Sequence, residues 1–174
     1  MKSIIIYSSK TGNTKKIADA IQEKLNADNI CTVEELENQD LNEYDLIVIG
    51  GWIDKGHMNE SIKQFIEKIN NKKVAFFYTL GAYPTSVHAY DCLERIKKDF
   101  IKNNNEIIEH FHCQGAVDPE LIKWMENLPS NHHHGFDEDR IRRLDDARNH
   151  PNQEDINGAY NFVSNIKRKL EKNV

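Results

Sequence analysis

The sequence predicts an α/β protein in which helices cover both faces of a parallel β-sheet. Short apolar runs recur along the chain, and helix-periodic segments separate most of them, an alternation typical of parallel sheets. Two of these runs, 46–49 and 74–80, are apolar throughout, as expected of central strands that are buried on both faces. With 174 residues, 39% of them hydrophobic, the chain has the size and composition of one domain with a continuous core. We therefore expect a single domain over residues 1–174.

Five apolar runs are the expected strands, and four periodic segments are the expected helices. The strands are 4–7, 30–33, 46–49, 74–80 and 107–111. The run 30–33 is the weakest and follows the first helix directly, which suits an edge strand. The helices are 13–26, 59–69, 86–102 and 153–171, each with apolar residues on one face. Asn152 with the acidic pair Glu154 and Asp155 suits a helix start, so the last helix should close the sheet.

The alternation breaks at about residues 114–150, which we interpret as an insertion before the final helix. It holds a short helix candidate, 119–127, and a charged, helix-like segment, 137–149, with a polar stretch between them. The polar stretch contains His132, His133 and His134, and the charged segment contains the one compact basic cluster of the sequence, Arg140, Arg142 and Arg143. An insertion at this point of the chain can overhang a ligand site.

A hydroxyl-rich loop follows the first expected strand and opens the first expected helix. It reads Ser8-Ser9-Lys10-Thr11-Gly12-Asn13-Thr14. Because the first N–H groups of a helix have no partner inside it and carry the positive end of its dipole, such a loop can hold a phosphate. The sequence is neither Gly-x-x-x-x-Gly-Lys-[Ser/Thr] nor Gly-x-Gly-x-x-Gly, which disfavours ATP and NAD. The alternative is a capped helix after a buried strand.

Two later loops are expected at the same edge of the sheet, where ligands of open doubly wound sheets bind. They are 50–57 and 79–85, and both contain glycine and one aromatic residue, Trp52 and Tyr83 respectively. Close backbone approach and an aromatic face suit a flat conjugated ring. The alternative places Trp52 under the end of the sheet and makes Tyr83 a turn residue before Pro84.

The first loop resembles the FMN-phosphate loop of flavodoxins at Ser9, Thr11, Gly12, Asn13 and Thr14, and the resemblance covers nearly the whole chain. It implies a flavodoxin-like three-layer sandwich with a five-stranded parallel sheet of order 2-1-3-4-5, helices on both faces, and FMN as the cofactor. The implied cofactor-binding residues are Ser9, Lys10, Thr11, Gly12, Asn13 and Thr14 in the first loop, Trp52, Ile53, Asp54, Lys55 and Gly56 in the second, and Thr79, Leu80, Gly81, Ala82 and Tyr83 in the third.

The loops also look like those of a narrower flavodoxin-like group from anaerobic gut bacteria, one member of which accompanies bilirubin reductase. The similarity lies in Gly-Trp-Ile-Asp-Lys-Gly, Thr-Leu-Gly-Ala-Tyr-Pro, Cys-Gln-Gly and the late pair His150-Pro151. Lys55 departs from ordinary flavodoxins, in which acidic residues are common at this place. A cation close to the flavin would raise its reduction potential, whereas acidic surroundings lower it.

The resemblance implies an electron-transfer protein that passes electrons from a reductase to an acceptor enzyme, both of them partner proteins. The alternative on the same fold is an FMN-dependent NAD(P)H oxidoreductase that reduces quinones or small electrophiles, because fold alone does not separate carrier from enzyme. A flavin-free interaction domain is disfavoured by the intact hydroxyl groups of the first loop. The short first loop and an acidic tract favour the carrier, and no side chain is assigned a catalytic role.

That acidic tract is the main feature of the charge distribution. The net charge is −5, and residues 25–54 contain eight acidic residues and no Lys or Arg. Such a surface can steer a basic partner protein, although a solvated loop would have the same composition. The same charge argues against nucleic acid, whose binding depends on Lys and Arg.

Membrane, cysteine and metal signals are weak throughout. No apolar run reaches the ~18 residues of a membrane span, and Met1-Lys2 leads straight into a strand without a signal peptide, so we expect a cytoplasmic location. Cys31, Cys92 and Cys113 are widely spaced within apolar patterns, which favours buried thiols over disulfides or metal ligands. The histidines provide no convergent ligand set, so no metal site is expected.

Overall fold

The computed structural model describes residues 1–36, 40–128 and 137–172 as an α/β sandwich. The strands are β1 (Ser3–Tyr7), β2 (Asn29–Thr32), β3 (Leu46–Asp54), β4 (His57–Met58), β5 (Lys73–Leu80) and β6 (Glu106–Gln114). The helices are α1 (Asn13–Leu25), α2 (Glu60–Lys68), α3 (Val87–Lys102), α4 (Pro119–Glu126), α5 (Glu138–Ala147) and α6 (Gln153–Glu171), with a 3₁₀ turn at Leu41–Glu43. The predicted helices are confirmed to within about a residue at each end.

The sheet differs from the prediction in one respect. It has six strands in the order β2-β1-β3-β5-β6, with β4 paired to β3, instead of five strands in the order 2-1-3-4-5. The prediction was wrong because it ended the third strand at Ile49, whereas β3 continues to Asp54 and turns back as an antiparallel hairpin with β4. The five longer strands pair in parallel, so the carboxyl ends of β1, β3 and β5 face the same way.

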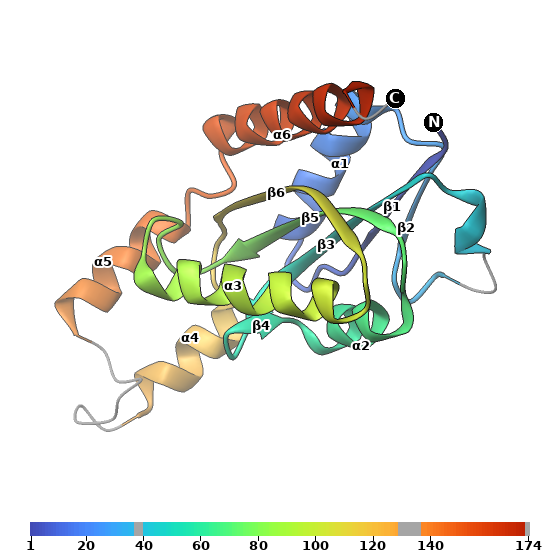
Figure 1. Cartoon of the computed structure of the whole chain (residues 1–174). Helices are drawn as coiled ribbons and strands as arrows, with labels where there is room; N and C mark the ends of the chain where they lie inside the picture. The colour runs from blue at the N-terminus through green and yellow to red at the C-terminus, as the bar shows by residue number, and fades with distance from the viewer. Residues whose placement is uncertain (37–39, 129–136, 173–174) are drawn as a thin grey trace.

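Helices cover both faces of the sheet, as predicted (Figure 1). Neighbouring residues of a strand point to opposite faces, so β5 sends Phe77 towards α1 and α6 and Phe76 towards α2 and α3. Gly50 lies on β3 directly beside the Phe77 ring, where a Cβ would come 2.1 Å from Cζ. The core on the α1 and α6 side therefore fits Phe77 only because the neighbouring strand lacks a side chain at this point.

The start of α6 confirms the predicted helix start. The Asn152 side chain accepts hydrogen bonds from the backbone N–H groups of Glu154 and Asp155, at 2.8 and 3.3 Å. The Asp155 carboxylate accepts from the Asn152 N–H in return, at 2.7 Å. This reciprocal arrangement satisfies helix N–H groups that have no partner inside the helix.

The predicted insertion contributes α4 and α5, which lie beyond the end of the sheet (Figure 1). The predicted histidine-rich stretch, His132, His133 and His134, lies outside the described residues. The three cysteines are free thiols; Cys92 and Cys113 are buried, and Cys31 is partly buried. Within the described ranges, no helix is both long and apolar enough to cross a membrane.

Two histidines of β6 stack in a row beneath α3. The His112 ring lies 4.9 Å from the Tyr78 ring and 6.5 Å from the His110 ring, centroid to centroid. Burial lowers the pKa of both histidines; Lys97 lowers that of His110 further, while Glu109 opposes the shift. The Pro84 carbonyl, 3.1 Å from His112 Nε2, can accept a hydrogen bond from the Nε2–H of the neutral ring.

We expect the free energy of unfolding to fall as pH drops from about 7 towards 5. A histidine whose pKa is lower in the folded than in the unfolded protein binds fewer protons when folded, so its contribution to stability is lost below its ordinary pKa of about 6.5. His112→Gln, which keeps a donor for Pro84 but does not titrate, should flatten this dependence in urea unfolding at several pH values. His88→Gln, at an exposed position, should leave the pH dependence of stability unchanged. Equal slopes in wild type and His112→Gln would contradict the attribution of this dependence to His112.

Candidate functional site

Three loops leave the carboxyl ends of β1, β3 and β5 and meet at the end of the sheet near α4 and α5 (Figure 1). We call residues 8–12 the first loop, 54–57 the second loop and 81–86 the third loop. The strand register brings them together, since Tyr7 pairs with Gly50 and Trp52 pairs with Thr79. The start of the first loop is held to β3, because the Ser8 N–H donates to the Gly50 carbonyl at 3.0 Å.

The first loop leaves open space directly before α1. Gly12 has a φ of +91°, a conformation that favours glycine, and no heavy atom outside its immediate neighbours lies within 4 Å of the place a Cβ would take. The Gly12 carbonyl accepts from the Lys16 N–H at 3.0 Å, so α1 starts directly after it. Ser9 Oγ accepts from the Lys15 N–H at 3.2 Å. The open space thus lies in front of the positive end of α1.

Thr14 links the three strand ends below the first loop. Its side chain is buried, and its hydroxyl lies 3.3 Å from the Gly51 carbonyl and 3.0 Å from the Thr79 hydroxyl. These partners come from β3 and β5, so one hydroxyl of α1 ties together elements that carry all three loops. Thr11, in contrast, is exposed at the tip of the first loop.

The second loop is a tight turn between β3 and β4. Lys55 and Gly56 both have positive φ values, 49° and 83°, which is the two-residue turn that matches the twist of a hairpin. Asn59 holds its base, because its side chain accepts from the Trp52 N–H at 3.2 Å and its own N–H donates to the Trp52 carbonyl at 2.8 Å. Arg95 of α3 donates to the Gly56 carbonyl at 3.4 Å. The turn is therefore held from two sides.

The third loop packs against the insertion. A Cβ at Gly81 would lie 2.4 Å from Val117 Cγ2, so glycine allows this close approach. The Tyr83 hydroxyl donates to Asp146 Oδ2 of α5 at 2.6 Å, and this hydrogen bond raises the Tyr83 pKa. Ser86 begins α3 by accepting from the Ala89 N–H, and its own hydroxyl donates to the Tyr83 carbonyl at 2.7 Å.

Residues 114–118 also contact the first loop and the start of α1. Lys10 Nζ pairs with Asp118 Oδ2 at 2.6 Å, which raises the lysine pKa and lowers the carboxyl pKa. Asn13 Nδ2 donates to the Ala116 carbonyl at 2.8 Å. On the other side, the buried Gln114 amide donates to the carbonyls of Gly81 and Arg143, both at 3.4 Å. One segment therefore contacts the first loop, the third loop and α5.

The structure brings the predicted site residues to one end of the sheet, but in unequal environments. The exposed or partly exposed residues are Ser9 to Gly12, Asp54, Lys55 and Tyr83. The partly buried residues are Asn13, Trp52, Ile53, Gly81 and Ala82. The buried residues are Thr14, Gly56, Thr79 and Leu80. Sequence reasoning missed Asn59, Arg95, Gln114 and Asp118 as parts of this site. Asn59 resembles an ordinary helix start, and the other three carry no local signal for their distant contacts.

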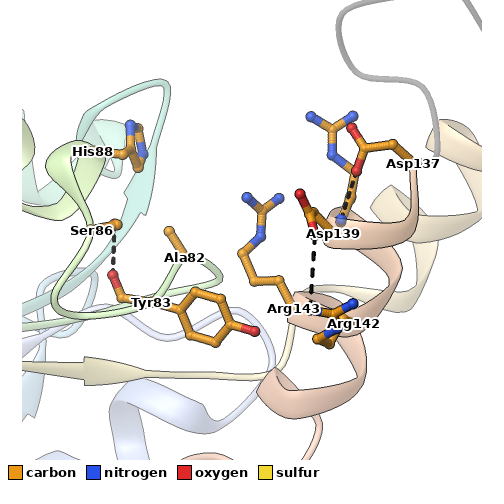
Figure 2. A pocket seen from close by; sticks show the side chains of 9 residues that line it. Ala82, Tyr83, Ser86, His88, Asp137, Asp139, Arg142 and Arg143 are labelled. Carbon is orange, nitrogen blue, oxygen red and sulfur yellow. Dashed lines mark hydrogen bonds and ion pairs between the residues drawn. The ribbon is translucent and has the colours of Figure 1, made fainter.

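Two hollows flank this arrangement. One, of about 410 Å³, lies beside the first loop and is lined by Tyr7, Ser8, Ser9, Gly12, Lys15, Thr32, Glu34 and Glu35. The other, of about 420 Å³, lies between the third loop and α5 and is lined by Ala82, Tyr83, Ser86, His88, Asp137, Asp139, Arg140, Arg142 and Arg143. Figure 2 shows the second hollow, with the side chain of Arg143 pointing towards the third loop.

The chain is similar to known proteins over most of its length. A family model described as a flavodoxin domain matches residues 4–164. A flavodoxin-like domain-containing protein, BilS of Clostridioides difficile, is 36% identical over 95% of this chain and 96% of its own length. The protoporphyrinogen IX dehydrogenase [quinone] of Escherichia coli is 30% identical over 44% of this chain and 47% of its own length.

The arrangement of the elements is also found in solved structures. Oxidised flavodoxin 2 from Bacillus cereus superimposes with a TM-score of 0.61 and covers 97% of this chain and 99% of its own, at 20% sequence identity. At that identity the likeness concerns the fold alone.

Proposed function

This chain belongs to the flavodoxin family, and on that premise we propose that it binds FMN and passes electrons from a reductase to an acceptor enzyme. The observation that carries the proposal is the first loop, in which Gly12 leaves open space in front of the positive end of α1. A phosphate group can bind in this space, because backbone N–H groups and the helix dipole both favour an anion at a helix start.

The residues of the first loop fit a phosphate group. The exposed Thr11 hydroxyl and the N–H groups at the start of α1 can donate to phosphate oxygens. Asn13 Nδ2 donates to Thr11 Oγ1 at 3.2 Å, so the threonine hydrogen is free to point towards the phosphate. Lys10 is held by Asp118, which leaves its backbone as the larger contribution. We assign phosphate binding to Ser9, Lys10, Thr11, Gly12, Asn13 and Thr14.

The second and third loops would hold the flavin ring. Residues 52–56 and 79–83 supply backbone at the edge of the site, and Trp52, which is partly buried, offers an aromatic face. Tyr83 is engaged by Asp146 of α5, so its ring is fixed at the border between the third loop and the insertion. When bound, FMN supplies the redox chemistry, and the chain's part is to orient the ring and limit its contact with water.

The surface beside the first loop suits a carrier that meets a basic partner. Glu34 and Glu35 line the hollow next to Ser9, and they belong to the acidic tract of residues 25–54. Charged surfaces of this kind raise the rate of encounter between proteins, which is useful for brief redox contacts. The electron donor and acceptor are therefore proposed to carry basic docking surfaces. We place the protein in the cytoplasm.

The second candidate function is an FMN-dependent oxidoreductase that acts on a small molecule. Two observations favour it: the similarity of 44% of the chain to a dehydrogenase, and the hollow between the third loop and α5. A carrier needs only an exposed ring edge, whereas an oxidoreductase needs a pocket beside the ring.

A spectroscopic titration separates the two functions. The purified protein is incubated with FMN, desalted, and titrated without oxygen, first with NADPH and then with dithionite. We expect the protein to retain its flavin absorbance after desalting. The absorbance should not change on addition of NADPH and should bleach with dithionite, as a carrier requires. Rapid bleaching by NADPH alone would support the oxidoreductase, and loss of all flavin on desalting would contradict the assignment of the first loop.

A further inference from the structure

The hollow between the third loop and α5 has two walls of different chemistry (Figure 2). The third loop contributes the methyl group of Ala82 and the ring of Tyr83, while α5 contributes arginine and aspartate side chains. The walls are held together by the hydrogen bond from Tyr83 to Asp146 and by Gln114, which donates to the carbonyls of Gly81 and Arg143. The hollow is therefore a preformed part of the fold.

Arg143 is the residue of this hollow with an unsatisfied hydrogen-bond donor. Its Nε is buried and, among the described residues, has no hydrogen-bond partner. A buried donor without a partner costs free energy, so such groups normally mark a bound water, ion or ligand. Its main chain is fixed at the same time, because the Arg143 carbonyl accepts from Gln114. The side chain of Arg143 lines the hollow, and its Nε is still without a partner there.

The aspartates on the same wall do not supply that partner. Asp137 Oδ1 accepts from the Arg140 backbone N–H at 2.7 Å and caps α5. Asp139 lies 3.9 Å from Arg142, and both of these side chains are largely exposed. Asp146 Oδ2 accepts from the Tyr83 hydroxyl. Within the described residues, no ion pair joins Arg143 to any of these carboxylates, so an external carboxylate can take the place opposite its guanidinium.

We propose that this hollow is a binding site for a small planar organic carboxylate, with Arg143 as the residue that recognises the carboxylate. The planar guanidinium matches a carboxylate through two parallel hydrogen bonds, and the Tyr83 ring and Ala82 methyl offer apolar contact to the rest of the molecule. A volume of about 420 Å³ has room for a compound with one or two rings. The concave shape favours such a molecule over the flat surface of a protein.

The site lies beside the third loop, which is one of the loops proposed to contact the flavin. Its use as a substrate or effector site therefore rests on the proposed function, but binding of the carboxylate does not. A carboxylate can bind in the presence or absence of FMN, so the two proposals can fail separately.

Binding is tested with 2-naphthoate as the probe, by isothermal titration calorimetry on the FMN-incubated and the flavin-free protein. We expect 2-naphthoate to bind at least about tenfold more tightly than 2-naphthamide, its neutral analogue, because a charge-assisted hydrogen bond is lost in the amide. Arg143→Gln should weaken 2-naphthoate by at least about tenfold and leave 2-naphthamide unchanged. Arg143→Lys should fall between these, because an ammonium group lacks the paired donors.

The matched control is Arg148→Gln, which removes an arginine from the end of the same helix but outside the hollow, where it pairs with Asp145 at 3.1 Å. It should change 2-naphthoate affinity by less than about twofold, and equal urea midpoints would show that all variants fold. Equal binding of carboxylate and amide, equal loss in Arg143→Gln and Arg148→Gln, or no heat of binding at millimolar probe would each overturn the proposal. Binding to flavin-free protein that fails to retain FMN would leave this site standing and reject the proposed function.

Discussion

Replacing Thr11 and Thr14 together by alanine is expected to weaken FMN binding by at least about tenfold, since hydrogen bonds to a charged group contribute more than neutral ones. The two residues act differently. Thr11 is exposed at the tip of the first loop and would donate to the phosphate, whereas Thr14 is buried and joins α1 to the Gly51 carbonyl and the Thr79 hydroxyl. The dissociation constant is read from quenching of flavin fluorescence in a titration.

Riboflavin, which lacks the phosphate, provides the control ligand for this experiment. Thr11→Ala should weaken FMN and leave riboflavin unchanged, whereas Thr14→Ala should weaken both and also lower the urea midpoint, because it leaves buried polar groups without a partner. Ser164→Ala removes an exposed hydroxyl of α6, distant from the loops in the sequence, and should affect neither ligand. Unchanged FMN affinity in the double variant would reject the first loop as the phosphate site.

Gly50→Ala is expected to destabilise the fold by about 3 kcal/mol or more, at the upper end of what overpacking a core costs. The added methyl would lie 2.1 Å from Phe77 Cζ and 2.6 Å from both neighbouring ring carbons, and Phe77 is fully buried, so the ring has no free space to enter. The measurement is the free energy of unfolding in urea, with the flavin absent so that ligand binding does not contribute.

A double-mutant cycle shows whether the clash is the cause. In a Phe77→Leu background the ring is gone, so the added penalty of Gly50→Ala should fall to about 1 kcal/mol or less, which appears as a large coupling energy. Additive effects of the two substitutions would mean that Gly50 is needed for another reason. The result also matters for the site, because the Gly50 carbonyl accepts from the first residue of the first loop, Ser8.

The helices and the longer strands could be predicted because their signals are local. Periodicity of 3.6 residues sets α1, α2, α3 and α6, and Asn152 with Asp155 marks the start of α6 within four residues of sequence. Such patterns report which face of an element is buried. These elements can therefore be predicted without knowing which other elements they pack against.

The extension of β3 was missed because residues 46–49 alone have the pattern of a complete strand. The pair Gly50 and Gly51 resembles the end of a strand, yet the chain continues in extended form and pairs Ile53 with Met58. The turn residues Lys55 and Gly56 contain a hairpin signal, since both adopt positive φ, but the return strand has only two residues. A strand this short has no periodicity of its own.

The contacts that assemble the site were out of reach for a different reason. The first loop is one continuous segment, so phosphate binding could be predicted from its sequence alone. Arg95 reaches Gly56 across 39 positions, and Asn13 reaches Ala116 across 103. No single-sequence pattern encodes which of many polar residues meet over such distances. The arginine cluster of α5 and Tyr83 were both noted in the sequence, but their position side by side was not predicted.

Residues 114–118, from the end of β6 to the start of α4, contact the first loop through Asp118, the start of α1 through Ala116, and the third loop through Gln114. A change in the position of one loop is therefore opposed by contacts with the same residues that hold the other. By thermodynamic linkage, a molecule held by the third loop and a phosphate held by the first would change each other's affinity by the same factor. Such a change in affinity would be carried by residues 114–118, because they contact both loops.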